Sequence, residues 1–159
     1  MATSNTYSAA GTKLYIATAA PATMDIAGFS AATWTQIGKI KNYQPASVEA
    51  EILTNQYLED LFESKSKGIN KVGNSTLNID VKDGDAGQTA VRESMNDKNL
   101  DYFKVAYPNG REKYIAAYVA GYSETDLQPT GMVSATVTLA QTLIETSTGN
   151  VTHIEKAAA

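Results

Sequence analysis

The chain has 159 residues, a formal net charge of −4 and no cysteine. The lack of cysteine excludes disulfide bonds and thiolate chemistry, and the acidic balance argues against a nucleic-acid grip, which needs clustered Lys and Arg. No apolar run approaches the roughly 20 residues of a membrane-spanning helix, and the first residues lack the basic and apolar regions of a signal peptide. We therefore expect one non-secreted domain over residues 1–159, without membrane contact, stabilised by packing or oligomerisation.

The first third of the chain predicts a polar arm followed by short strands. Residues 1–11 are small and polar, which is typical of a flexible N-terminal arm. Lys13–Thr18 is rich in β-formers, whereas Ala19–Thr33 consists mostly of Ala, Pro, Gly, Ser and Thr and predicts a loop. Trp34–Tyr43 and Ser47–Thr54 are strand-like. In the second of these runs, strand alternation separates two faces, one with Val48, Ala50 and Ile52 and the other with Glu49, Glu51 and Leu53.

Residues 56–75 break the strand pattern and predict a long loop between two strands. Apolar residues at helical spacing come first, and a run rich in Ser and Lys follows. A connection of this length is uncommon in a compact domain unless it is functional. Two interpretations stay open: a small surface helix that covers its own domain, or an arm that packs on a neighbouring subunit. The second interpretation predicts a subunit or ring interface made by Tyr57, Leu58, Leu61, Phe62, Lys65, Lys67 and Ile69.

The middle of the chain predicts one strand and then one helix. Apolar and polar residues alternate from Asn74 to Lys82, which is the pattern of a half-buried strand. A helix over Ala86–Asn96 follows, with an apolar stripe on one side. Asp85 is placed to cap its first turn, and Gln88 stands three residues later, where a capping-box side chain reaches back.

The remaining sequence predicts a hairpin, a long strand and a polar tail. Leu100–Tyr107 and Arg111–Val119 flank Pro108-Asn109-Gly110, in which Asn-Gly supplies the positive φ of a tight turn. Gly121 is a candidate for a β-bulge. Met132–Ile144 has one apolar face and one Ser/Thr face, which fits the wall of a sandwich or barrel. Residues 146–159 are polar and then Ala-rich, and we expect a C-terminal tail.

No catalytic or cofactor-binding constellation is present in the sequence. Asp80, Asp83 and Asp85 lack the ligand rhythm of a calcium loop and fit a turn with a helix cap. His153 is the only histidine, and we expect it to be solvated in the tail. Nucleotide-binding and nucleophile-elbow patterns are missing. We therefore expect no enzyme, no metal and no cofactor.

Several of these segments together resemble the major tail tube proteins of long-tailed, siphovirus-type bacteriophages. The resemblance extends over roughly Thr33–Ser147. The segments that carry it are, in order, Trp34–Gly38, Val48–Thr54, Asp83–Gln88, Tyr107–Gly110, Tyr114–Tyr122 and Val133–Leu139.

The resemblance implies a mainly β protein, a β-sandwich or barrel-like tail tube fold with one flanking α-helix and a long inter-strand loop. In such proteins six copies form a ring, and stacked rings form a tube through which double-stranded DNA passes during ejection. The implied partners are other copies of the chain, the tape measure protein, and the tail tip and terminator proteins. The implied location is the virion, after synthesis in the host cytoplasm.

A tube that conducts DNA needs a lumen that phosphates do not adhere to. Acidic and hydroxyl side chains meet this need, because they repel phosphates and offer no base readout. We expect the lumen to be lined by Glu49, Glu51, Ser134, Thr136 and Thr138. Two other functions stay open: a monomeric carbohydrate-binding or adhesion module, to which the five tyrosines between residues 102 and 122 would contribute, and a secretion-system tube protein of related fold.

Overall fold

The computed structural model describes residues 6–125 and 127–158. Strands dominate, as the sequence predicts, and none of the described helices is long and apolar enough to cross a membrane. Two of the elements are helices, α1 (Ile26–Ala31) and α2 (Ala86–Asn96). The strands are β1 (Lys13–Ala17), β2 (Thr35–Ile37), β3 (Ile40–Gln44), β4 (Val48–Asn55), β5 (Ser64–Val72), β6 (Asn74–Asp80), β7 (Asp101–Ala106), β8 (Glu112–Glu124), β9 (Ser134–Thr142), β10 (Ile144–Thr146), β11 (Gly149–Val151) and β12 (Ile154–Lys156).

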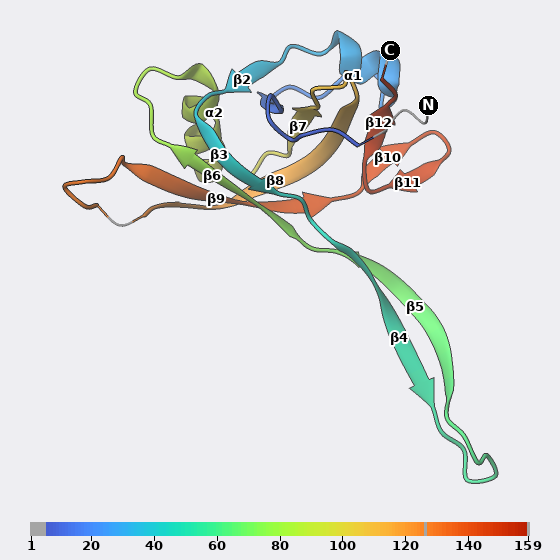
Figure 1. Cartoon of the computed structure of the whole chain (residues 1–159). Helices are drawn as coiled ribbons and strands as arrows, with labels where there is room; N and C mark the ends of the chain where they lie inside the picture. The colour runs from blue at the N-terminus through green and yellow to red at the C-terminus, as the bar shows by residue number, and fades with distance from the viewer. Residues whose placement is uncertain (1–5, 126, 159) are drawn as a thin grey trace, which may run out of the picture.

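Eight antiparallel strands form one sheet that folds over on itself. The strand order is β2-β1-β7-β8-β9-β6-β3, and β12 pairs with β8. The 13-residue β8 connects two layers, because residues 112–117 pair with β7 while residues 116–124 pair with β9. A register shift between Val119 and Gly121 confirms the predicted bulge. In Figure 1, β9, β6 and β3 lie beneath the rest of the body.

The core lies between these layers and beneath α2. Alternate residues of β6 and β9, such as Leu77 and Val137, are fully buried there, and Val91 of α2 packs against them. A second cluster is aromatic and contains Phe29 and Tyr114, whose ring centroids are 5.1 Å apart. Burial of these apolar side chains is the main stabilising contribution to the fold.

The loop predicted over Ala19–Thr33 is wrong in one part, because it contains α1. The Asp25 carboxylate accepts a hydrogen bond from the Gly28 N–H at 2.7 Å and caps this helix. Phe29 then enters the aromatic cluster, and the Trp34 Nε1–H donates to its carbonyl oxygen at 2.8 Å. Tertiary packing therefore stabilises a helix of six residues that composition alone does not indicate.

Helix α2 has the predicted bounds, and its cap is confirmed by a hydrogen bond of 2.9 Å from the Gln88 N–H to Asp85 Oδ1. The Gln88 side chain does not complete a capping box. It is fully buried and connects three backbone groups of the turns around it. These groups are the N–H of Lys82 and the carbonyl oxygens of Gly38 and Asp80.

The chain after β9 is more ordered than a polar tail. Ile144 is 2% exposed in the aromatic cluster, and β12 adds to the sheet beside β8. His153, expected to be solvated, is half-buried, and burial lowers its pKa. Residues 1–5 of the predicted N-terminal arm and Ala159 of the predicted tail lie outside the described residues.

The predicted loop over residues 56–75 is mostly a strand. Ser64–Val72 forms β5 and pairs with β4, so only residues 56–63 connect two strands, and they contain no helix. Helical spacing over so few residues cannot nucleate a stable helix, whereas pairing with β4 satisfies the backbone of β5.

Candidate assembly surfaces

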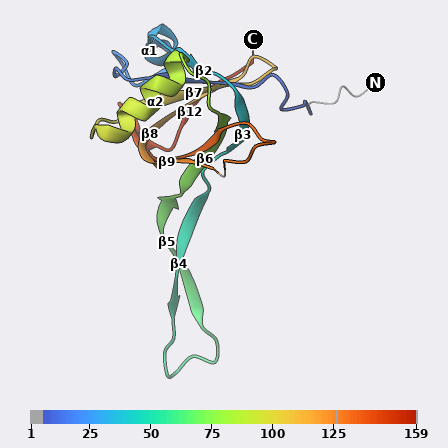
Figure 2. The same ribbon diagram turned by 90° about the vertical axis from the view of Figure 1, so that its left-hand side faces the viewer.

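Strands β4 and β5 with their connection form a ribbon, residues 48–72, which we call the arm. Figures 1 and 2 show the arm projecting away from the body in both views. It continues the β3–β6 pair, and the Gly73 N–H donates to the Ser47 carbonyl oxygen at 2.8 Å where the two pairs meet. An isolated two-stranded ribbon is marginally stable in water. The arm therefore lacks the packing that stabilises the other strands.

The arm carries half of the large apolar side chains that are exposed among the described residues. Leu61 is 94% exposed and Phe62 is 86% exposed, both in the connection at the tip. Val48, Ile52, Leu53, Tyr57, Leu58 and Ile69 are the others. An apolar group of this size on one projecting element marks an interaction surface. All seven residues predicted to form the subunit interface lie on this arm.

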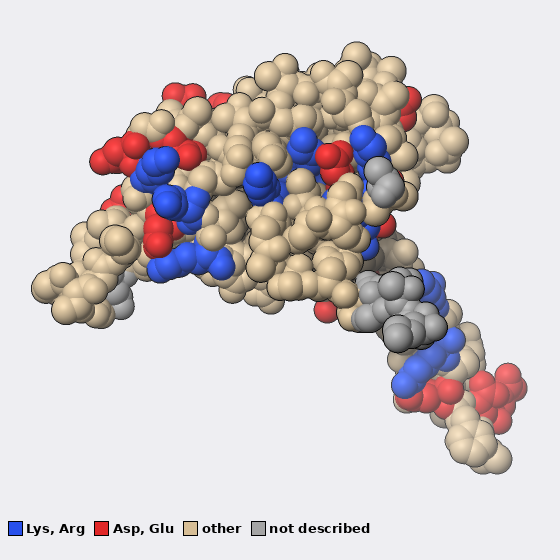
Figure 3. Space-filling view, turned by 45° about the horizontal axis from the view of Figure 1, so that its top comes forward, with Lys and Arg blue, Asp and Glu red and all other residues tan. Residues whose placement is uncertain are grey.

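Charge is distributed unevenly along the arm. Lys71 pairs with Glu51 at 3.2 Å on the strands, and Lys65 pairs with Glu63 at 3.3 Å nearer the tip. Figure 3 shows lysines along the ribbon and acidic side chains toward its end. Exposed ion pairs of this kind contribute little stability. They leave the apolar side chains of the arm uncovered.

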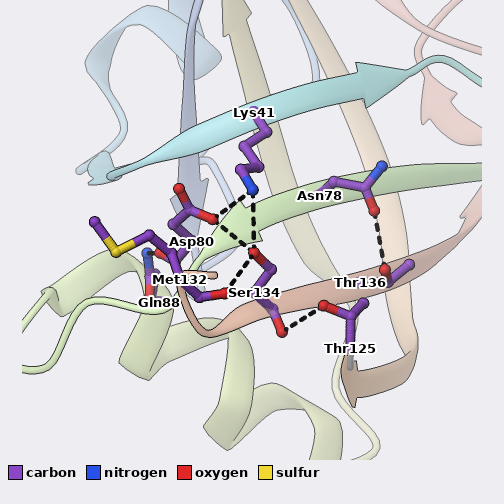
Figure 4. Close-up of polar contacts among 8 residues, drawn as sticks. All are labelled: Lys41, Asn78, Asp80, Gln88, Thr125, Met132, Ser134 and Thr136. Carbon is purple, nitrogen blue, oxygen red and sulfur yellow. Dashed lines mark hydrogen bonds and ion pairs between the residues drawn. The ribbon is translucent and has the colours of Figure 1, made fainter. Parts of the chain in front are cut away.

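The body presents a second surface, the outward side of the layer β8–β9–β6–β3, which we call the polar face. Strand register places Thr136 opposite Asn78, and the Thr136 hydroxyl donates to Asn78 Oδ1 at 2.9 Å (Figure 4). Residues of these strands on the opposite side, including Leu77 and Val137, are in the core. The polar residues that define this face are Asn42, Gln44, Thr76, Asn78, Asp80, Ser123, Ser134, Thr136 and Thr138.

The predicted lumen-lining residues fall into two groups. Ser134, Thr136 and Thr138 share the polar face. Glu49 and Glu51 lie on β4 of the arm, so the structure does not bring them together with the hydroxyl groups. The predicted alternation over Asn74–Lys82 is confirmed and places Asp80 on the same side as Asn78, although Asp80 was not among the predicted lining residues.

A charged cluster occupies one end of the polar face (Figure 4). Lys41 Nζ lies 2.9 Å from Asp80 Oδ1 and donates to Ser134 Oγ at 3.2 Å. The Ser134 hydroxyl donates to the same Asp80 oxygen at 2.7 Å. The hydrogen bond from Ser134 and the pairing with Lys41 lower the pKa of Asp80. The carboxylate is thus held ionised between a hydroxyl and an ammonium group.

The polar-faced layer ends in two unpaired backbone edges. Among the described residues, no strand pairs with the outer edge of β3, and none pairs with residues 118–124 of β8 on the edge opposite β9. A hollow of about 410 Å³ lined by Tyr43 and Tyr107 lies beside the first edge. A hollow of about 370 Å³ lined by Tyr118 and Leu143 lies near the second. Unpaired backbone edges are sites for association with another strand.

The sequence matches the family described as Lambda phage tail tube protein, TTP, over residues 14–148. The chain belongs to this family. No curated protein matches it. Among solved structures, the SPP1 tail tube protein is similar, with 14% identity, a TM-score of 0.58, and coverage of 82% of this chain and 72% of that one.

Two further structures share the tail tube fold. A chain from the tail of an empty GTA particle matches with 16% identity and a TM-score of 0.55, covering 72% of this chain and 85% of that chain. A chain from the PVC sheath/tube terminator of an extracellular contractile injection system matches with 10% identity and a TM-score of 0.63. The match covers 98% of this chain and 100% of that chain. These likenesses confirm the mainly β tail tube fold.

The family assignment confirms the resemblance inferred from the sequence and identifies the protein as a structural component of a phage tail tube, a part of the virion. It favours the tail tube interpretation over a carbohydrate-binding module. Within the described residues, no group of three or more His, Asp or Glu side chains is arranged to hold a metal ion.

Proposed function

We propose that six copies of this chain close head to tail into a ring, and that stacked rings form a tube that conducts double-stranded DNA during ejection. The observation that carries this proposal is the polar-faced layer with its two unpaired edges. The edges belong to different strands, so the contact is heterologous, and such a contact generates a ring when its rotation closes. Closure then removes every free edge of the layer.

Pairing of β3 in one copy with residues 118–124 of β8 in the next joins four strands per subunit into a continuous barrel. Six subunits give 24 strands, and barrels with fewer strands already enclose a water-filled channel. Support for six copies comes from the sequence resemblance and from the C6 symmetry stated for the similar GTA tail. The polar face lines the inside, because the other side of the layer is core.

The arm supplies contacts between subunits or between rings. Its apolar tip gains most if a neighbouring copy covers it, since each fully buried large apolar side chain contributes about 1.5–3 kcal/mol. The ends of the tube then engage the tape measure, tail tip and terminator proteins. The role is mechanical and not enzymatic, and the chain is made in the host cytoplasm before it enters the virion.

Passage of DNA depends on the lining. The hydroxyl and amide groups of the polar face carry no positive charge for phosphates to bind. Glu49 and Glu51, the second paired with Lys71 at 3.2 Å, continue the lining onto the ribbon that extends β3 and β6. Six copies at −4 each give a ring of −24, which repels phosphates within about a Debye length, roughly 8–10 Å.

Negative-stain electron microscopy and light scattering of the concentrated protein test this proposal. We expect hollow rings or tubes with sixfold end views and scattering that increases steeply above a threshold concentration. A protein that remains monomeric at high concentration, even when tail tip complexes are added as initiators, would contradict it.

A further inference from the structure

We propose that Asp80 masks Lys41, a lysine at one end of the polar face, so that its ammonium group is not available to DNA phosphates. This inference rests on the proposed function, because it concerns what the face does once it lines the lumen. It assigns Asp80 and Ser134 a purpose other than strand pairing: they hold the Lys41 ammonium group on the wall of the channel.

The backbone places Lys41 on the polar face through a β-bulge. Ile40 pairs with Ile79 and belongs to the core side, while Asn42 pairs with Asn78, only one residue earlier on β6. Lys41 is therefore an extra residue in β3. Bulges of this kind redirect a side chain, and here the Lys41 ammonium group reaches both Asp80 and Ser134.

Lys41 lies beside a surface that is otherwise almost uncharged. Its other members are amides and hydroxyls, with Asp80 as the only carboxylate among the described residues that form it. A free lysine among neutral groups would be the preferred contact for a phosphate, since positively charged side chains supply most nonspecific affinity for DNA. With the Asp80 carboxylate at 2.9 Å, the ammonium group is already neutralised within its own subunit.

Sixfold symmetry would multiply the number of lysines that one duplex meets. Each ring of six would present six such lysines to one duplex, and every ring of the tube would repeat them. One unmasked lysine that reaches a phosphate gains about 1 kcal/mol in water, which is about a fivefold increase in binding. Several such contacts along a duplex would act as a brake on its movement.

The test uses assembled tubes and a fluorescent short DNA duplex at low salt. After the tubes are sedimented, the bound fraction is measured as salt is increased. We expect wild-type tubes to retain little duplex and Asp80→Asn tubes to retain at least about fivefold more. Retention by this variant should fall with salt more steeply than in the wild type. The double variant Asp80→Asn/Lys41→Gln should return to the wild-type level.

Two further variants separate masking from other effects. Lys41→Gln alone should leave retention unchanged, because the lysine it removes is already masked. Glu93→Gln, on the exposed side of α2, changes net charge by the same amount as Asp80→Asn and should not increase retention. A similar increase with Glu93→Gln would show that overall charge, and not Lys41, governs binding.

The inference is overturned if Asp80→Asn tubes retain no more duplex than wild-type tubes, or if Lys41→Gln alone lowers retention. If Asp80→Asn subunits do not assemble alone, tubes formed together with wild-type subunits are tested in the same way, and retention that does not increase with the share of Asp80→Asn subunits overturns the inference. If the wild-type protein forms no rings or tubes at all, the proposed function fails first, and this failure is distinct from a failure of the mask.

Discussion

Replacement of two almost fully exposed large side chains of the tip, Leu61→Ser with Phe62→Ser, should prevent assembly and leave the folded subunit intact. Both side chains are almost fully exposed and belong to neither core cluster. Surface substitutions away from packed features change the free energy of unfolding by only about 0.5 kcal/mol. The folded subunit should therefore denature at nearly the wild-type urea concentration.

The double substitution should weaken assembly far more than it weakens the folded subunit. If a neighbouring copy buries both side chains, their loss removes about 1.5–3 kcal/mol each, or about 3–6 kcal/mol per contact. Such a loss weakens that contact by roughly 10²- to 10⁴-fold. The threshold concentration for tube formation, measured by light scattering, should rise beyond the accessible range.

A core variant provides the comparison. Leu139→Ala alters a fully buried side chain of β9 and should lower the free energy of unfolding by about 2–5 kcal/mol. If the double tip variant is destabilised to a similar extent, the tip packs on its own subunit. Tubes that form at the wild-type threshold despite the double variant would refute the role of the arm in assembly.

Three predictions concern the fold itself. Gly87→Ala would place a methyl group 2.2 Å from the Gln36 carbonyl oxygen and should lower the free energy of unfolding in urea by about 3 kcal/mol. Gly131→Ala should lower it little, because the added methyl group would make only an ordinary contact, 3.8 Å from the Gln128 carbonyl oxygen. Burial raises the pKa of Asp101, so the folded state holds this proton to a higher pH than the unfolded chain does. The stability that this carboxyl contributes is present below about pH 4 and is lost as pH rises through its folded-state pKa. When the free energy of unfolding is measured across a pH series, Asp101→Asn should abolish this loss of stability. Gln88→Leu leaves three backbone groups without their side-chain partner and should lower the free energy of unfolding by about 3 kcal/mol or more. Unchanged thermal stability would contradict the role given to the Gln88 amide.

Local rules predicted the elements whose signals are contained in neighbouring residues. The bounds of α2 follow from its Asp85 cap and apolar stripe, and the β7–β8 hairpin follows from Asn109-Gly110, where Gly110 has a φ of 90°. The long strand signal that begins near Met132 became β9, with its Ser/Thr face grouped on one side as predicted.

Features that depend on distant partners were missed. Helix α1 is stable because Phe29 packs on Tyr114, and β5 forms because it pairs with β4, although its own composition is that of a polar loop. The bulge that aims Lys41 depends on the register between β3 and β6, which no local pattern encodes. For this reason Lys41 was absent from the predicted lining residues.

A cryo-electron microscopy reconstruction of the assembled tube tests the central claim most directly. The account predicts sixfold rings in which β3 of one subunit lies beside residues 118–124 of β8 in the next, with Asn78 and Thr136 facing the lumen. A tube in which the polar face points outward, or in which these two edges do not meet, would contradict it.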